Sequence, residues 1–93
     1  MSAVSPSKRK PLILIVASLA GCKVLRALLP LRSYRLREAS GGGEAVALFA
    51  AGRPDLVLVD LAPPDQRGMG VCRMLARVAG PAGVPLLAVC GVA

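Results

Sequence analysis

The chain has 93 residues, which allows at most one small domain, expected to bury about 60 to 65% of its unfolded surface. Its hydrophobic fraction is 55% with only two aromatic residues, so the core must be built from aliphatic side chains. A net charge of +7 comes with no histidine, which excludes catalysis by histidine and most zinc sites, and no apolar run reaches the roughly 18 to 20 residues of a membrane span.

Residues 1–10 are rich in serine and positive charge and predict a disordered basic leader, which leaves residues 11–93 as the domain. The apolar run Leu12–Val16 has the length of a strand and predicts one that is buried on both faces. A helix is expected from Leu19 to Leu29, because apolar residues recur there at helical spacing and a proline follows. The more polar segment Tyr34–Glu38 predicts a second strand, nearer a sheet edge.

In the second half, the glycines of Ser40–Gly43 predict a turn, and a short helix is expected over Glu44–Ala51. Leu56–Asp60 predicts a third buried strand. A helix over Met69–Ala79 is expected to end at the glycines that follow it, and Val84–Cys90 predicts a fourth buried strand. Regular alternation of strands and helices predicts an α/β fold with right-handed crossovers and a doubly wound parallel sheet.

The third strand stops at a carboxylate, Asp60, and a turn follows it. Ligands of open α/β sheets bind outside the carboxyl ends of the strands. The pattern alone therefore makes Asp60 a candidate site residue. The run Gly41–Gly43 before Glu44 lacks the spacing of a phosphate-binding loop and is typical of a turn.

The three cysteines, Cys22, Cys72 and Cys90, lie far apart and form no Cys-x-x-Cys pair, which predicts reduced core thiols in a cytoplasmic protein. Basic residues are spread along the chain without neighbouring aromatic residues. We therefore expect a solvated basic surface, with no direct nucleic-acid binding and no membrane association.

From about Pro11 to Gly91, the chain resembles the receiver domain of bacterial two-component response regulators. The resemblance rests on Arg-Pro-Asp-Leu-Val-Leu-Val-Asp-Leu at residues 53–61 and on Pro64 and Gly68, four and eight residues after Asp60. It implies a flavodoxin-like fold with strand order 2-1-3-4, lacking the family's fifth strand and last helices. By this resemblance Asp60 is the phospho-acceptor, which attacks the phosphohistidine of a sensor kinase and forms an acyl phosphate.

The chain departs from the family at the groups that support this chemistry. Receivers hold Mg²⁺ with two acids after the first strand, and they place Thr or Ser after the fourth strand and Lys after the fifth. The acidic-pair positions are Ala17 and Ser18 here, the Thr/Ser position is Cys90, and no fifth strand follows to supply the Lys. Asp60, the Ser18 hydroxyl and a carbonyl near Ala62 would form at best a weak Mg²⁺ site, and no other cofactor is expected.

A carboxylate that attacks a phosphoryl dianion needs such groups, because they offset charge repulsion. We therefore expect a degenerate pseudo-receiver that is not an enzyme and acts through protein–protein contacts. Its partner would be a sensor histidine kinase or another signalling protein. Without the covering elements of the family, the chain alone is expected to be marginally stable, and the open edge of the fourth strand is expected to pair with a second copy or a partner.

Two alternatives stay open. One is a receiver that accepts a phosphoryl group with weak activity. The other is a lipoprotein, because Leu19-Ala20-Gly21-Cys22 has the shape of a lipoprotein cleavage box and follows a basic and then an apolar stretch. Cleavage before Cys22 would remove the first predicted strand, so the lipoprotein and the receiver interpretations exclude each other.

Overall fold

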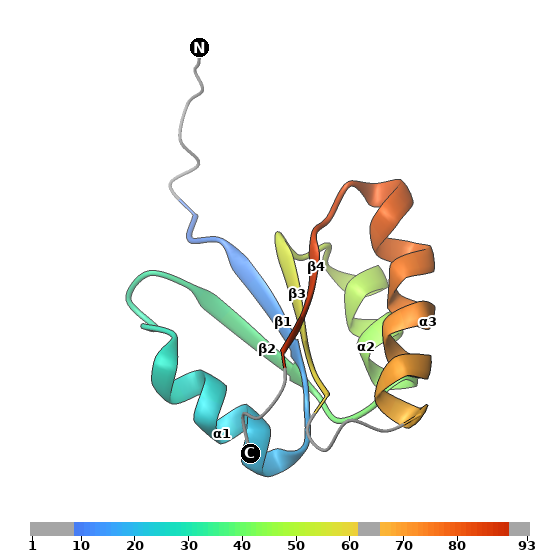
Figure 1. Cartoon of the computed structure of the whole chain (residues 1–93). Coiled ribbons are helices and arrows are strands. Elements are labelled where there is room, and N and C mark those ends of the chain that lie inside the picture. Colours follow the sequence, from blue (N-terminus) through green and yellow to red (C-terminus); the bar gives the residue numbers. More distant parts are fainter. Residues whose placement is uncertain (1–8, 62–65, 90–93) are drawn as a thin grey trace.

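Parallel strands form one sheet in the order β2-β1-β3-β4 (Figure 1). A computed structural model describes residues 9–61 and 66–89 of the chain, without the side chains of 66–68. The strands are β1 (Leu12–Val16), β2 (Arg35–Ala39), β3 (Leu56–Asp60) and β4 (Leu86–Val89). This order confirms the predicted flavodoxin-like topology, and β2 lies at a sheet edge as its polar sequence predicts.

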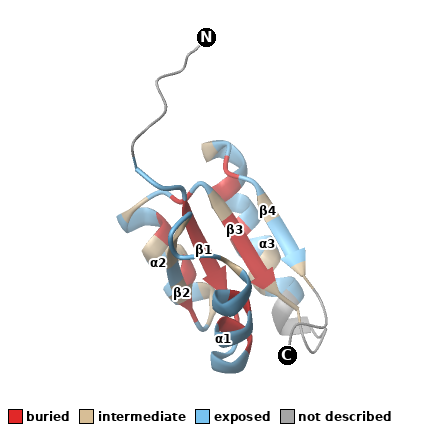
Figure 2. Cartoon of the chain, turned by 90° about the vertical axis from the view of Figure 1, so that its left-hand side faces the viewer, coloured by how far each residue is buried: buried red, intermediate tan, exposed pale blue. Residues whose placement is uncertain are grey.

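Helices cover both faces of the sheet. They are α1 (Leu19–Leu28), α2 (Gly42–Ala51) and α3 (Gln66–Ala82). One core cluster joins α1 to the sheet and contains Ile13, Ile15 and Leu25. A larger cluster, which includes Leu14 and Leu75, joins α2 and α3 to the opposite face. Successive side chains of a strand point to opposite faces, so β1 supplies both clusters and is buried along its whole length (Figure 2).

Helix α2 begins at Gly42, two residues before its predicted start, so Gly42 and Gly43 belong to the helix instead of a turn. The carbonyl of Gly41 accepts the first helical bond, from the Ala45 amide at 3.0 Å. Glu44 lies in the first turn and its Oε1 accepts the Ser40 amide at 2.8 Å. A carboxylate at this end of a helix is favourable, which helps to start the helix on residues of low helical propensity.

Helix α3 runs from Gln66 to Ala82, which extends past both ends of the prediction. The expected break at Gly80 is wrong, because the helix continues through Gly80 and Pro81 and ends at Gly83, where φ is 72°. The amide of Gly83 donates to the Gly80 carbonyl at 3.0 Å, and the amide of Val84 donates to the Ala79 carbonyl at 2.9 Å. These two bonds form a Schellman motif, which closes the helix and leaves Pro81 in its last turn.

Strand β4 is shorter and more exposed than predicted. It covers Leu86–Val89, and residue 90 lies outside the described residues. Leu87 is 52% exposed, which corrects the expectation of a buried strand. Leu87 pairs in register with Leu58 and so lies on the face that α1 covers, but Figure 2 shows α1 away from β4. About half of the Leu87 side chain therefore stays in solvent within the described part of the chain.

None of the helices within the described residues is long and apolar enough to cross a lipid bilayer.

Candidate functional site at the carboxyl edge of the sheet

Asp60 ends β3 beside the end of β1. Val16 and Val59 pair in register, so Ala17 and Asp60 each come directly after that pair. The Asp60 side chain is half-buried, and its Oδ2 atom is shielded from solvent. That oxygen lies against the first turn of α1, where a Cβ placed on Gly21 would collide with it. The carboxylate predicted from the sequence is therefore at the edge of the sheet and packed against a helix.

The two residues at the acidic-pair positions meet Asp60 around Gly21. A Cβ on Gly21 would lie 3.1 Å from the Ala17 Cβ and 3.4 Å from the Ser18 Oγ. Ala17 is buried and offers only a methyl group. Ser18 is the N-cap of α1: its Oγ accepts the Gly21 amide at 3.1 Å, and its carbonyl accepts the Cys22 amide at 2.8 Å. The structure thus brings together Ala17, Ser18 and Asp60, and it gives Ser18 a structural role.

The remaining predicted site residues cannot be placed as a group. Pro64 and Cys90 lie outside the described residues, as does Ala62. Gly68 lies in the first turn of α3. The supporting turn and the Thr/Ser position therefore stay predictions.

The described part of this edge offers few ligands for a Mg²⁺ ion. Asp60 supplies a carboxylate there, and the Ser18 Oγ already accepts a helix amide. Among the residues that the structure describes, no group of three or more Cys, Asp or Glu side chains is arranged to hold a metal. Mg²⁺ demands near-octahedral oxygen ligands, so Asp60 and Ser18 alone leave most of its positions to water.

Gly21 is the site residue that sequence reasoning missed. The amino end of α1 carries no acidic residue in its first turn, and the Asp60 carboxylate approaches that turn from β3. A negative charge beside the amino end of a helix is stabilised by the partial positive charge of the unpaired amides. The signal in the sequence is the small pair Ala20-Gly21 at the start of the helix.

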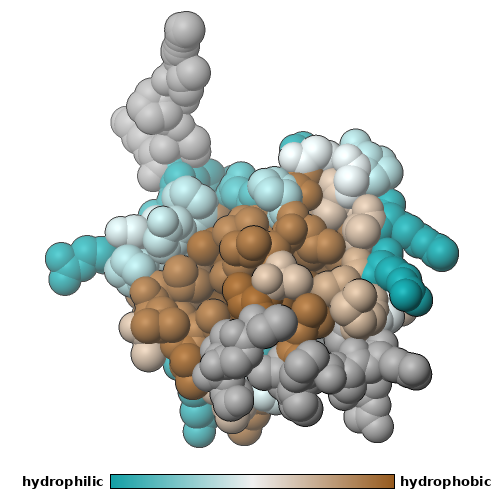
Figure 3. All heavy atoms as spheres, in the orientation of Figure 1, coloured by the Kyte–Doolittle hydropathy of each residue, from teal (hydrophilic) through white to brown (hydrophobic). Residues whose placement is uncertain are grey.

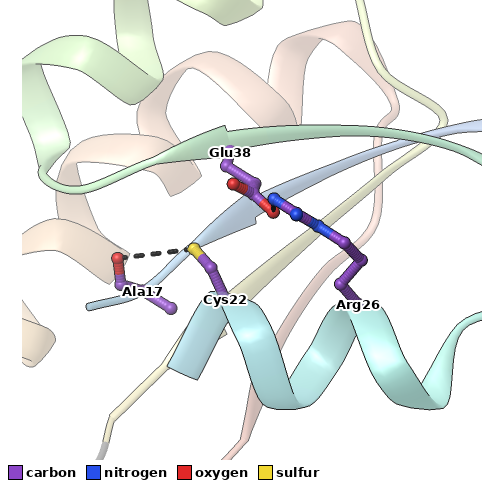
Figure 4. Close-up of polar contacts among 4 residues, drawn as sticks. All are labelled: Ala17, Cys22, Arg26 and Glu38. Carbon is purple, nitrogen blue, oxygen red and sulfur yellow. Dashed lines mark hydrogen bonds and ion pairs between the residues drawn. The ribbon is translucent and has the colours of Figure 1, made fainter. Parts of the chain in front are cut away.

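Cys22 lies one residue further along α1 and faces inward (Figure 4). Its Sγ donates to the Ala17 carbonyl at 3.7 Å. Burial raises the pKa of the Cys22 thiol above its ordinary value of 9.0, the carboxylates of Glu38 and Asp60 raise it further, and Arg26 lowers it in part. The thiol is therefore protonated at neutral pH. Cys22 is a free buried cysteine and Cys72 a free half-buried one, whereas Cys90 lies outside the described residues.

Arg26 and Glu38 form an ion pair that joins α1 to β2 (Figure 4). The pair adds a polar contact between α1 and β2 beside the apolar cluster that joins α1 to the sheet. Cleavage before Cys22, as in the lipoprotein alternative, would remove β1, which pairs with both β2 and β3.

Comparison with known proteins adds one sequence relative. No family model matches the chain. The chain is 32% identical over 65 residues to the protein PilH of Pseudomonas aeruginosa, a match that covers 70% of this chain and 54% of PilH. The chain therefore spans about half the length of this curated relative.

Solved structures show the same fold. A crystal structure of a protein from Chloroflexus aurantiacus, assigned as a response regulator, aligns with a TM-score of 0.70 and 23% identity over 86% of this chain and 66% of the other. A fusion that carries a trimeric coiled-coil segment of yeast Spc42 aligns with a TM-score of 0.69 and 22% identity over 88% of this chain and 54% of the other. The relative and the first of these structures together support a receiver domain.

Proposed function

We propose that this receiver domain acts in two-component signalling as a degenerate receiver, through protein–protein contacts instead of phosphorylation of Asp60. The observation that carries the proposal is the pair of residues at the end of β1. Asp60 stands at the acceptor position, but Ala17 and Ser18 bring it no second carboxylate. The fold is present, and the two positions after β1 that carry acids in the family carry none here.

The absence of the acidic pair raises the activation free energy of phosphoryl transfer, because of the charges that meet in the reaction. A carboxylate oxygen must approach a phosphoryl group that is itself negative, and transfer depends on cations and donors that neutralise the phosphoryl oxygens. Loss of one such preorganised contact costs roughly 3 to 4 kcal/mol, or about two to three orders of magnitude in rate. The Asp60 Oδ2 is also packed against Gly21 and shielded from solvent, so an attack by this oxygen would first require it to leave the contact.

The proposal also covers the binding partner and the cellular location of the domain. A sensor histidine kinase or another signalling protein is the expected partner, in the cytoplasm, and the domain binds it without acting as an enzyme or contacting nucleic acid. The exposed β4 edge is the surface through which copies of the chain would associate.

A receiver that accepts a phosphoryl group weakly is the second candidate. Its support is the position of Asp60 beside the amino end of α1, where the Ser18 cap and the helix amides favour negative charge. Those amides would supply part of the positive charge that a metal held by two acids supplies in the family.

Mass spectrometry after incubation with acetyl phosphate and Mg²⁺ separates the two candidates. We expect no gain of one phosphate in the full chain. A gain that disappears in Asp60→Asn would contradict the degenerate receiver and establish the weak acceptor.

A gain-of-function variant tests the physical reason. Ser18→Asp adds a carboxylate beside Asp60 and keeps a residue that caps helices well. Labelling should rise above that of the wild type in Ser18→Asp and not in Ser33→Asp, which adds the same charge to an exposed loop. Unchanged labelling in Ser18→Asp would show that the missing acid is not what limits Asp60.

A further inference from the structure

A polar pocket lies at the amino edge of the sheet, opposite Asp60. Its volume is about 480 Å³. The residues that line it come from the start of β1, the start of β2 and the loop before β3. They are Arg9, Lys10, Pro11, Arg35, Arg53 and Asp55. Neither the receiver resemblance nor the Asp60 chemistry accounts for this pocket.

Backbone bonds between the strands hold the walls of the pocket in place. The Arg35 amide donates to the Pro11 carbonyl at 2.8 Å, and the Asp55 amide donates to the Leu12 carbonyl at 2.7 Å. Asp55 Oδ2 accepts the Leu12 amide in return, also at 2.7 Å. The side chain of Asp55 therefore ties the loop before β3 to the start of β1.

Two of the cations are also held by main-chain carbonyls. The Arg35 Nε donates to the Lys10 carbonyl at 3.0 Å, and the Lys10 Nζ donates to the Leu31 carbonyl at 2.9 Å. The Nη groups of Arg35 take no part in the bond to the Lys10 carbonyl. Side chains oriented before a ligand arrives lose less conformational entropy when it binds.

Charge in the pocket is unbalanced. Four cationic side chains face one carboxylate, and the carboxylate already accepts a backbone amide. The described residues form no ion pair with Arg35 or Arg53. Positive charges gathered in a concave surface reinforce one another's potential and attract anions.

We propose that this pocket binds a small anion that carries two linked phosphate groups. Arginine presents a planar fork of donors that matches phosphate oxygens in pairs, and Arg35 and Arg53 lie on two different walls. The volume lies within the range of small-molecule sites, about 300 to 1,000 Å³. Pro11 is the one apolar residue in the lining, so little of the pocket would hold the apolar parts of a peptide.

Isothermal titration of the full chain with pyrophosphate at low salt tests the proposal. Arg53→Gln should weaken binding about tenfold, because a hydrogen bond to a charged group is lost. Arg73→Gln makes the same charge change on an exposed part of α3 and should leave the dissociation constant within about twofold. Circular dichroism and thermal melting of both variants report whether each is folded as the wild type is.

Other ligands distinguish the source of the phosphate groups. ADP that binds more tightly than pyrophosphate would assign a nucleoside diphosphate, and equal binding would assign the free diphosphate. AMP should bind more weakly than either. Asp60→Asn should leave all of these affinities unchanged, so this proposal and the degenerate receiver can fail separately.

Three results would overturn the proposal. The first is the absence of saturable pyrophosphate binding. The second is an equal loss of pyrophosphate affinity in Arg53→Gln and Arg73→Gln. The third is Arg53-dependent binding of an oligoglutamate peptide without binding of pyrophosphate. The last would assign the pocket to an acidic protein segment.

Discussion

At the residue scale, Gly21 sets the distance between α1 and the candidate acceptor. No other residue type leaves room at this position, since even one added carbon would collide with the Asp60 Oδ2 and press on the Ala17 Cβ. The packing of Asp60 and the start of α1 are therefore decided by a residue without a side chain. A change at residue 21 should act on Asp60 directly.

Gly21→Ala is expected to destabilise the fold by about 1–3 kcal/mol, the range for overpacking a tight contact. Urea unfolding measures this change. Gly43→Ala is the matched control, because a Cβ there meets nothing within 4 Å in the first turn of α2. In an Asp60→Ala background most of the cost of Gly21→Ala should disappear. If Gly21→Ala destabilised the Asp60→Ala variant as much as the wild type, the strain would not come from contact with Asp60.

The sequence predicts the location of Asp60 and misses its surroundings. Four aliphatic residues before the acid, Leu56–Val59, are enough to place it at the carboxyl end of a buried strand. Its contact with Gly21 joins residues 39 positions apart, and no local pattern encodes such a contact. The family resemblance marks Ser18 only as the position of an absent acid, whereas its bond to the Gly21 amide follows from ordinary helix capping.

At the element scale, α3 shows how a helix ends beyond an apparent break. Gly80 and Pro81 both favour an early end, yet the helix continues through both to Ala82. The left-handed Gly83 and the two Schellman bonds determine the actual end. Gly80 and Gly83 look equivalent in the sequence, and only the backbone geometry distinguishes their roles.

Gly83→Ala and Gly70→Ala, the second inside α3, should have opposite effects. The first forces a Cβ into left-handed geometry and should cost about 1–2 kcal/mol. The second removes a flexible residue from the helix, where a Cβ meets nothing within 4 Å, and should stabilise by about 0.5–1 kcal/mol. Chemical denaturation of the pair measures both. If both variants changed the free energy of unfolding in the same direction, the assigned helix end would be contradicted.

At the scale of the whole molecule, the two faces of the sheet are covered unequally. Two helices pack on one face and α1 alone on the other (Figure 1). Figure 3 shows hydrophobic side chains gathered on the surface between α1 and α3. The β4 segment within it, Leu86–Val89, carries no charge and no proline, which are the usual protections of an edge strand.

Leu87→Lys is expected to lower self-association of the chain without unfolding it, since this side chain already lies half in solvent. Sedimentation equilibrium over a range of concentrations measures the effect. Leu31→Lys adds the same charge at a leucine that is also exposed, in the loop after α1, and should change association less. If both variants behave as the wild type does, β4 is not an association surface.

The order of the strands could be predicted because each buried run and each amphipathic helix is local in the sequence. The burial of β4 could not be predicted in the same way. Its residues are as apolar as those of β1. However, β1 has neighbouring strands on both sides and helices on both faces, whereas β4 is an edge strand that α1 does not reach (Figure 2). Which layers cover a strand depends on the whole assembly and not on the strand itself.

The central place of β1 also constrains how the chain folds. β1 is synthesised before both of its neighbours in the sheet, β2 and β3, and the bond from the Leu12 amide to Asp55 spans 43 residues. Sheet formation must therefore close long loops before β1 gains its second partner, which slows folding relative to a chain with local contacts. Until Asp55 arrives, one edge of an entirely apolar strand is unpaired, and aggregation competes with folding during that interval.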